Sequence, residues 1–120
     1  MKILCICNHG NVRSDSLRHA IWTLNGKCYG TSEEYLKEYI KYEAIAIGAH
    51  CSSDGTLELL INWADKVIDL SDNDERIQNK IKGFAKEKYI RKDIGEDIWG
   101  NPLNEELQRI TLSIAKEITK

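Results

Sequence analysis

Apolar side chains recur along this chain with two different spacings, which predict strands and helices in turn. Short apolar runs without a helical period predict strands at residues 2–7, 44–47, 66–70 and 88–94. Apolar positions three or four apart predict helices at residues 14–24, 32–42, 56–63, 74–84 and 104–118. Strand and helix therefore alternate over the whole chain.

This alternation decides the expected fold class. Strands that are joined through helices by short connections favour a parallel sheet covered by helices on both faces. We therefore predict an α/β fold, a single three-layer domain over residues 1–120 with a four-stranded parallel sheet. At 120 residues, with 42% hydrophobic side chains, the chain is long enough to bury a core without disulfides or metal.

Charge and the amino-terminal pattern narrow the classes of partner. The formal net charge is −2, and basic and acidic residues are interspersed rather than gathered in blocks. This pattern indicates no nucleic-acid partner and no membrane partner, so any anion site must be local. The apolar start at residues 3–7 is too short for the core of a signal peptide and predicts a cytoplasmic protein.

The cysteines and histidines do not form a recognisable metal motif. Cys5, Cys7 and His9 alternate, but this run lacks the paired spacings of structural zinc sites, even when His50 and Cys51 are added. Four cysteines at irregular spacings also do not make a disulfide framework. The sequence predicts free thiols, no metal and no organic cofactor.

The strongest chemical signal is the run Cys-Asn-His-Gly-Asn-Val-Arg-Ser at residues 7–14. It places a thiol at the end of a strand, then a five-residue loop, then a guanidinium and a hydroxyl at the start of a helix. Successive N–H groups of such a loop can converge on a tetrahedral oxyanion, helped by the positive end of the helix. The expected oxyanion-binding residues are Asn8, His9, Gly10, Asn11, Val12, Arg13 and Ser14.

Several of these residues have a specific use in phosphoryl transfer. The helix end and Arg13 favour the thiolate form of Cys7, which is the nucleophilic form. Arg13 offers a planar fork that can bind two phosphoryl oxygens. Ser14 can donate a hydrogen bond to the Cys7 sulfur, and Gly10 permits the positive φ that turns loop amides inward. We predict that Cys7 accepts a phosphoryl group.

The spacing of Cys, five residues, Arg and Ser resembles the phosphate-loop signature of cysteine-dependent phosphatases. Its place in the first strand resembles the low-molecular-weight protein tyrosine phosphatases. The resemblance implies a phosphate-monoester hydrolase that acts through a phosphocysteine, without a cofactor, on a protein carrying phosphotyrosine or on a small phosphate monoester. Larger tyrosine phosphatases carry the general-acid aspartate upstream of the cysteine, and the six residues before Cys7 cannot house it.

The same resemblance selects a general acid. In the low-molecular-weight family, a segment of the type Asp-Pro-Tyr-Tyr-Gly near the C-terminus supplies it, and residues 95–100 here read Gly-Glu-Asp-Ile-Trp-Gly. The resemblance implies Asp97 as the catalytic acid, with Asp93 and Glu96 as alternatives. Trp99 stands where the family places an aromatic residue beside the substrate, and a half-buried core tryptophan is the other interpretation.

The chain also departs from the family pattern. The family usually has Asn in place of Gly10, a second Cys in place of Val12 and Pro in place of Ile98. Glycine adopts the left-handed conformation of that Asn, so the first change is mild. The tyrosine-rich stretch that includes residues 29–42 has no counterpart that can be aligned, and its role stays open.

Other functions are consistent with parts of the motif. Cys-x-x-Gly-x-x-x-Ser also resembles the cellobiose-type EIIB phosphocarriers, whose cysteine passes phosphate to a sugar without hydrolysis. Those carriers lack an arginine before the serine, so Arg13 favours the phosphatase. Arsenate reductases of this fold relay a disulfide through later cysteines, and none follows Cys51. A catalytically inactive descendant that binds phosphate is the third interpretation.

Overall fold

The computed structural model describes residues 1–25, 41–96 and 98–120. Its strands are β1 (Lys2–Cys7), β2 (Glu43–Gly48), β3 (Lys66–Asp69) and β4 (Tyr89–Arg91). Its helices are α1 (Arg13–Thr23), α3 (Asp54–Trp63), α4 (Glu75–Ala85), the short 3₁₀ helix η1 (Lys86–Lys88) and α5 (Glu105–Ile118). Within these ranges, no helix is long and apolar enough to cross a bilayer.

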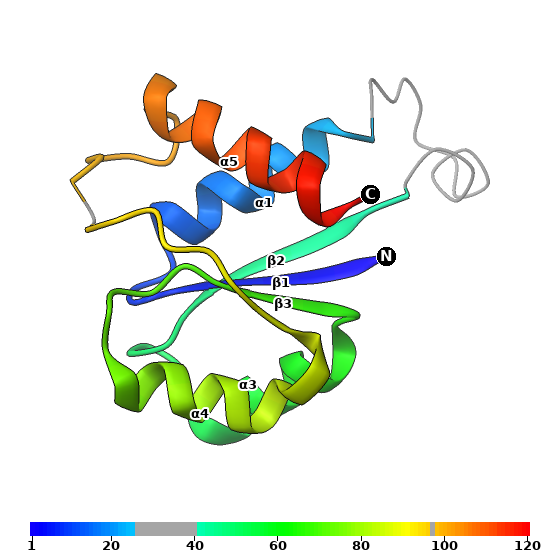
Figure 1. Cartoon of the computed structure of the whole chain (residues 1–120), viewed down its shortest axis with the longest axis vertical. Coiled ribbons are helices and arrows are strands. Elements are labelled where there is room, and N and C mark those ends of the chain that lie inside the picture. The colour runs from blue at the N-terminus through cyan, green and yellow to red at the C-terminus, as the bar shows by residue number, and fades with distance from the viewer. Residues whose placement is uncertain (26–40, 97) are drawn as a thin grey trace.

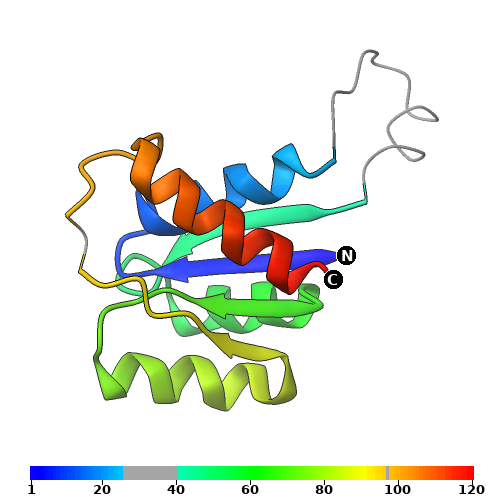
Figure 2. The same cartoon turned by 45° about the horizontal axis from the view of Figure 1, so that its top comes forward.

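The predicted fold class is confirmed. All neighbouring strands are parallel, in the order β2-β1-β3-β4. Figure 1 shows α1 and α5 over one face of the sheet and α3 and α4 over the other. The view turned by 45° keeps α5 and α4 on opposite sides of the strands (Figure 2). The sheet is therefore the middle of three layers.

The central strand β1 joins two apolar layers. Ile3 and Cys5 belong to the layer beneath α1 and α5, whereas Leu4 and Ile6 belong to the layer beneath α3 and α4. All four side chains are fully buried. A continuous apolar run of this kind is typical of a parallel strand covered on both faces. The carboxyl end of β1 is consequently held in place from both sides.

Parallel pairing brings the carboxyl ends of the strands to one edge of the sheet. Cys7 lies opposite Gly48 of β2, and Ile6 lies opposite Asp69 of β3. The chain leaves β1 for β2 on one side and later returns to β3 on the other, so the direction of winding reverses at β1. Open α/β sheets bind ligands outside the carboxyl ends of strands at such a point. The loop after Cys7 occupies this position.

Two elements differ from the sequence prediction, and a third predicted element lies outside the described residues. The strand predicted at residues 88–94 shortens to β4, because this half-buried edge strand is followed by a turn in which Gly95 has φ of +85°. Helix α3 begins before residue 56, because the Ser53 side chain caps it by accepting from Thr56 N–H at 3.2 Å. The helix predicted at residues 32–42 lies outside the described residues.

The end of β2 is pressed against the loop that follows β1. Ala49 N–H donates to the carbonyl oxygen of Cys7 at 2.8 Å. A Cβ atom on Gly48 would lie 2.4 Å from the carbonyl carbon of His9, and a Cβ atom on Gly10, which has φ of +80°, would lie 2.5 Å from the backbone nitrogen of Gly48. Real Cβ atoms do not come so close to a backbone. The loop can follow its path because residue 48 has no side chain.

This close approach predicts a large effect of one methyl group. The substitution Gly48→Ala should lower the free energy of unfolding by about 3 kcal/mol, since the added carbon meets backbone that cannot move away cheaply. The matched control is Gly83→Ala in α4, where an added Cβ meets nothing within 4 Å. It should stabilise the protein by about 0.5–1 kcal/mol through helix propensity. Urea unfolding of both variants checks this, and equal stabilities would show that the contact is not tight.

Candidate active site

Cys7 lies at the carboxyl end of β1 with its sulfur turned into the loop that follows. Its side chain is 2% exposed. The N–H of Gly10 donates to Cys7 Sγ at 3.1 Å, and the Ser14 hydroxyl oxygen lies 3.2 Å from the same sulfur. Donors directed at a sulfur stabilise its thiolate form. The structure thus brings together the thiol, the loop amide and the hydroxyl that the sequence selects.

Helix α1 starts where this loop ends. Its N-cap residue, Val12, makes no side-chain hydrogen bond to the helix, so the first-turn amides are not capped by it. Such amides carry partial positive charge and bind anions. Asn11 is exposed and Val12 is half-buried, whereas Ser14 is fully buried beside Cys7. The loop therefore opens to solvent at Asn11 and closes at Ser14.

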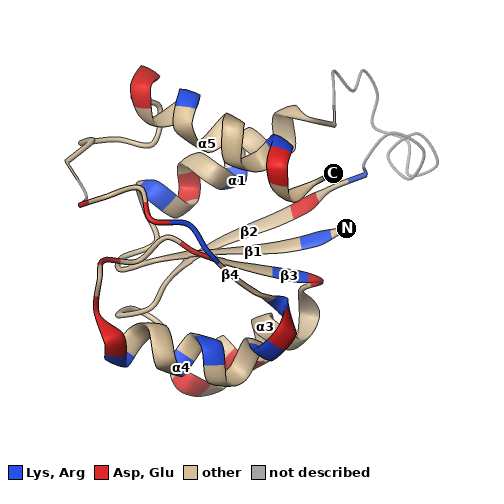
Figure 3. Ribbon diagram, in the orientation of Figure 1, with Lys and Arg blue, Asp and Glu red and all other residues tan. Residues whose placement is uncertain are grey.

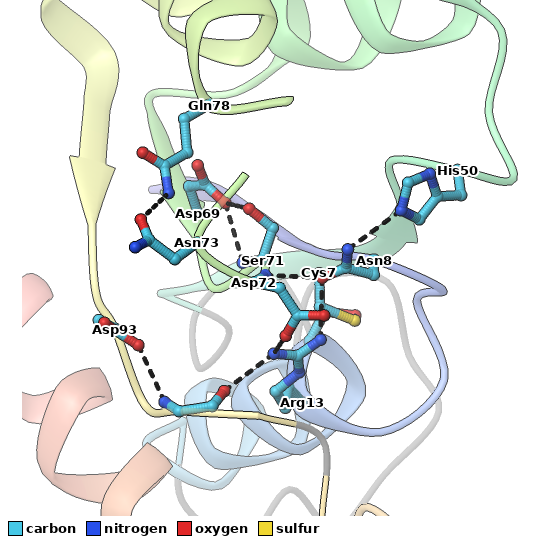
Figure 4. Close-up of polar contacts among 12 residues, drawn as sticks. Cys7, Asn8, Arg13, His50, Asp69, Ser71, Asp72, Asn73, Gln78 and Asp93 are labelled. Atoms are coloured by element: carbon cyan, nitrogen blue, oxygen red, sulfur yellow. Dashed lines mark hydrogen bonds and ion pairs between the residues drawn. The ribbon is translucent and has the colours of Figure 1, made fainter. Parts of the chain in front are cut away.

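Arg13 is the most constrained side chain of the site, with 1% of its surface exposed. Its Nη1 donates to Asp72 Oδ1 at 2.6 Å and to the carbonyl oxygen of Gly95 at 3.0 Å, and its Nη2 donates to Asn8 Oδ1 at 2.9 Å (Figure 4). Its Nε is buried and finds no acceptor among the described residues. Buried donors are normally paired. An oxyanion in the loop would supply the missing acceptor.

Asn8 links the loop to two other segments through its side chain. The Oδ1 atom accepts from Arg13 Nη2 and, at 2.7 Å, from the backbone N–H of Asp72. The Nδ2 atom lies 3.1 Å from Nε2 of His50. The loop motif predicts a role for Asn8 through its backbone N–H alone. No local pattern could have revealed the side-chain role, because His50 and Asp72 are 42 and 64 residues away.

A buried carboxylate shapes the turn that carries Asp72. Asp69 is fully buried, and its Oδ1 accepts from the N–H of Ser71 at 2.9 Å and from its hydroxyl at 2.6 Å. The phenol of Tyr89 donates to Asp69 Oδ2 at 2.7 Å. Burial, and then the hydrogen bond to Asp69, raise the pKa of Tyr89, so the phenol stays a donor. The turn after β3 is thereby fixed, and Asp72 is fixed with it.

The segment after β4 lies against Arg13 from the far side. Asp93 Oδ1 accepts from Gly95 N–H at 2.9 Å, and the carbonyl oxygen of Gly95 then accepts from Arg13. Asp93 and Glu96, the two alternative acids, therefore belong to a segment tied to the arginine. Asp97, the acid implied by the family resemblance, lies outside the described residues.

These loops enclose a cleft of about 720 Å³ at the carboxyl edge of the sheet. Figure 3 shows acidic residues on the two loops that follow β3 and β4. Three carboxylates, of Asp72, Asp93 and Glu96, therefore line the same cleft as the buried guanidinium of Arg13. The residues that line the cleft are His9, Arg13, Asp72, Asn73, Asp93, Gly95 and Glu96.

Trp99 does not belong to this lining. It is half-buried, its carbonyl oxygen accepts from Asn104 Nδ2 at 3.3 Å, and its indole Nε1 is buried without an acceptor among the described residues. Its role as a wall of the substrate pocket stays a prediction. Over the described ranges, no three side chains of His, Cys, Asp or Glu gather closely enough to hold a metal ion.

Comparison with known proteins shows that the chain shares its fold with solved structures. No family model and no curated protein matches the sequence. Three solved structures are similar to the chain over nearly their whole length. A YwlE mutant from Bacillus subtilis is 14% identical with a TM-score of 0.61, covering 100% of this chain and 99% of that one. A YwlE arginine phosphatase mutant with a phosphorylated active-site serine is 13% identical with a TM-score of 0.63, covering 100% and 97%.

The third structure is the YwlE arginine phosphatase from Geobacillus stearothermophilus. It is 15% identical with a TM-score of 0.58, covering 98% of this chain and 92% of that one. YwlE proteins belong to the low-molecular-weight protein tyrosine phosphatase family, so the resemblance drawn from residues 7–14 is confirmed for the fold. Sequence identities this low show a shared fold, and the activity depends on the residues of the site itself.

Proposed function

We propose that this protein is a cysteine-dependent phosphatase in which Cys7 carries the phosphoryl group. The observation that carries the proposal is the convergence of Gly10 N–H and the Ser14 hydroxyl on one buried sulfur, beside a buried arginine. Nucleophile, oxyanion donors and guanidinium are the parts that phosphoryl transfer to a thiolate needs. The shared fold of the YwlE arginine phosphatases supports the same reading.

The proposed cycle has two steps. The Cys7 thiolate attacks phosphorus, the bond from phosphorus to the leaving group breaks, and a proton passes to the leaving atom. Water then attacks the phosphocysteine, the S–P bond breaks, and inorganic phosphate leaves with Cys7 again a thiolate. The hydrogen bond from Ser14 makes the sulfur a better leaving group in this second step. No metal or organic cofactor takes part, and a reducing compartment such as the cytoplasm would keep the thiol free.

Arg13 contributes through its orientation. Asp72 and Gly95 take both hydrogens of Nη1, and Asn8 takes one of Nη2, so the buried Nε–H and the second Nη2–H are the donors left for phosphoryl oxygens. A donor fixed before the reaction stabilises transition-state charge without reorganisation. Lysine has neither the planar fork nor the set of donors that these contacts use.

Asp97 is the proposed general acid. It would protonate the leaving atom in the first step and activate water in the second. Support comes from the family resemblance and from its neighbours, since Gly95 contacts Arg13 and Glu96 lines the cleft. The alternative acids are Glu96 and Asp93, both of which line the cleft.

The proposed substrate is a phosphorylated protein, with phosphotyrosine as the first candidate. The resemblance of residues 7–14 to tyrosine phosphatases supports this choice. The burial of the Cys7 sulfur supports it too, because a long phenolic ester reaches further into a deep loop than phosphoserine does. A small phosphate monoester would meet the same nucleophile.

Phosphoarginine is a second candidate, favoured by the charge of the cleft. Asp72, Asp93 and Glu96 line it, and carboxylates match the planar donors of a guanidinium. The double substitution Asp93→Asn and Glu96→Gln should lower kcat/KM about fivefold to tenfold for a phosphoarginine peptide, and little for a phosphotyrosine peptide. An equal loss on both peptides would instead give one of these carboxylates the general-acid role.

Hydrolysis of aryl phosphates in the presence of a chelator tests the proposed activity. Cys7→Ser should lose at least about 10³-fold in kcat, because the nucleophile is gone. Arg13→Lys should lose about 10²–10³-fold, as expected when a transition-state donor is removed. Asp97→Asn should slow phenyl phosphate, a poor leaving group, far more than para-nitrophenyl phosphate.

The matched controls are Cys51→Ser, at an exposed thiol, and Arg18→Lys, at a partly exposed arginine that pairs with Asp15. Both should keep wild-type rates. Turnover that survives Cys7→Ser would contradict the proposal. A wild-type protein that holds a stable phosphocysteine without turnover would be a phosphocarrier, and one that binds phosphate without reacting would be the inactive form.

A further inference from the structure

The contacts of Asn8 determine the protonation state of its neighbour His50. Asn8 Oδ1 faces two groups that can donate but not accept, namely Nη2 of Arg13 and the backbone N–H of Asp72. The oxygen must therefore stand at this end of the amide, and the NH₂ group must face His50 Nε2 at 3.1 Å. Because the amide nitrogen is a donor, Nε2 has to accept. The imidazole is then neutral, with its proton on Nδ1.

We propose that His50 is a positioning residue for phosphoryl transfer, acting through Asn8 on Arg13. Unprotonated Nε2 holds the Asn8 amide in the orientation that lets its oxygen engage both Arg13 and the turn at Asp72. The backbone N–H of His50 also donates to the carbonyl oxygen of Asn8 at 2.9 Å, so the two residues are joined twice. This inference rests on the proposed function, because the contact matters for Arg13 as a transition-state donor.

A proton on His50 would break this arrangement. Nε2–H and the Asn8 NH₂ group would then face each other as two donors, and the hydrogen bond between them would be lost. Turning the amide over does not help, because its NH₂ group would then face the donors of Arg13 and Asp72. Histidine is the side chain that gains its proton between about pH 8 and 5. When His50 gains that proton, the loop is therefore expected to lose its oriented arginine.

Ionisable side chains from the loop and from α4 also lie near His50. The ring of His9, from the loop, has its centre 5.5 Å away. From α4 and its N-cap residue, Asp74, Arg76 and Lys80 share with His50 a hollow of about 350 Å³. Carboxylate, ammonium and guanidinium groups as classes keep their charge between about pH 6 and 9. Among the described side chains that line this hollow or stack near it, His9 is thus the other group whose charge can change in the range of interest.

The pH dependence of kcat/KM for para-nitrophenyl phosphate tests the inference. His50→Gln supplies an amide oxygen that accepts at every pH, so its rate should lie within about twofold of wild type near pH 8 and fall less steeply than that of wild type toward acid pH. His50→Leu supplies no acceptor and should lower kcat/KM about fivefold near pH 8. The matched control is His19→Gln on the exposed side of α1, which should keep the wild-type profile.

Three kinetic results would overturn the inference. One is a His50→Gln variant that keeps the full acid-side fall of the wild type. Another is an equal loss for His50→Gln and His50→Leu at every pH, which a structural role in packing would give. The third is a change in the acid-side fall of kcat/KM in His9→Gln, together with an unchanged fall in His50→Gln.

A second measurement reads the imidazole itself and needs no turnover. Nitrogen-15 chemical shifts of His50 near pH 8 should show an unprotonated Nε2 and a protonated Nδ1, and Asn8→Ala should remove this preference. An Nε2–H tautomer in the wild type would defeat the inference even if the protein hydrolyses phosphate esters. If the predicted tautomer is found but the protein does not hydrolyse phosphate esters, the contact between His50 and Asn8 stands and the proposed activity is wrong.

Discussion

A guanidinium cannot be taken out of water without partners, and the pairing of Arg13 organises the rest of this structure. The side chain is 1% exposed and draws its acceptors from three parts of the chain: Asn8 in the loop after β1, Asp72 after β3 and Gly95 after β4. Each contact fixes the arginine and also fixes the segment that supplies it. The carboxylates that line the cleft are therefore positioned by the same group that would bind the phosphoryl oxygens.

The sheet makes this pairing possible. Strands β1, β3 and β4 are adjacent and parallel, so the segments that follow them meet at one edge, and the turn after β2 adds His50 from the other side of β1. The buried Asp69 then fixes the turn that presents Asp72. Fold and site are thus connected through a few polar contacts, and substituting one of these residues should change the arginine's orientation before it changes the fold.

The sequence predicts the local part of the site and misses the long-range part. The strand, the loop at residues 7–14 and the following helix are contiguous, so their spacing alone predicts the contact of Ser14 with the Cys7 sulfur and the positive φ of Gly10. The fold class follows from the alternation of apolar periods, although the edge strand β4 is shorter than predicted because a glycine turn follows it. The contacts of Arg13 with Asp72 and Gly95 span 59 and 82 residues, and no spacing in the sequence encodes them.

The proposed function depends on the Cys7 sulfur carrying the phosphoryl group during turnover. Quenching the protein in a denaturant at neutral pH within milliseconds of mixing with para-nitrophenyl phosphate, followed by peptide mass mapping, measures this directly. A good leaving group makes breakdown of the intermediate the slow step, so the intermediate accumulates. We expect one phosphoryl group on the peptide that contains Cys7, formed and lost at rates that match turnover. Hydrolysis that proceeds while Cys7 stays unmodified, or a phosphoryl group on His9 instead, would contradict it.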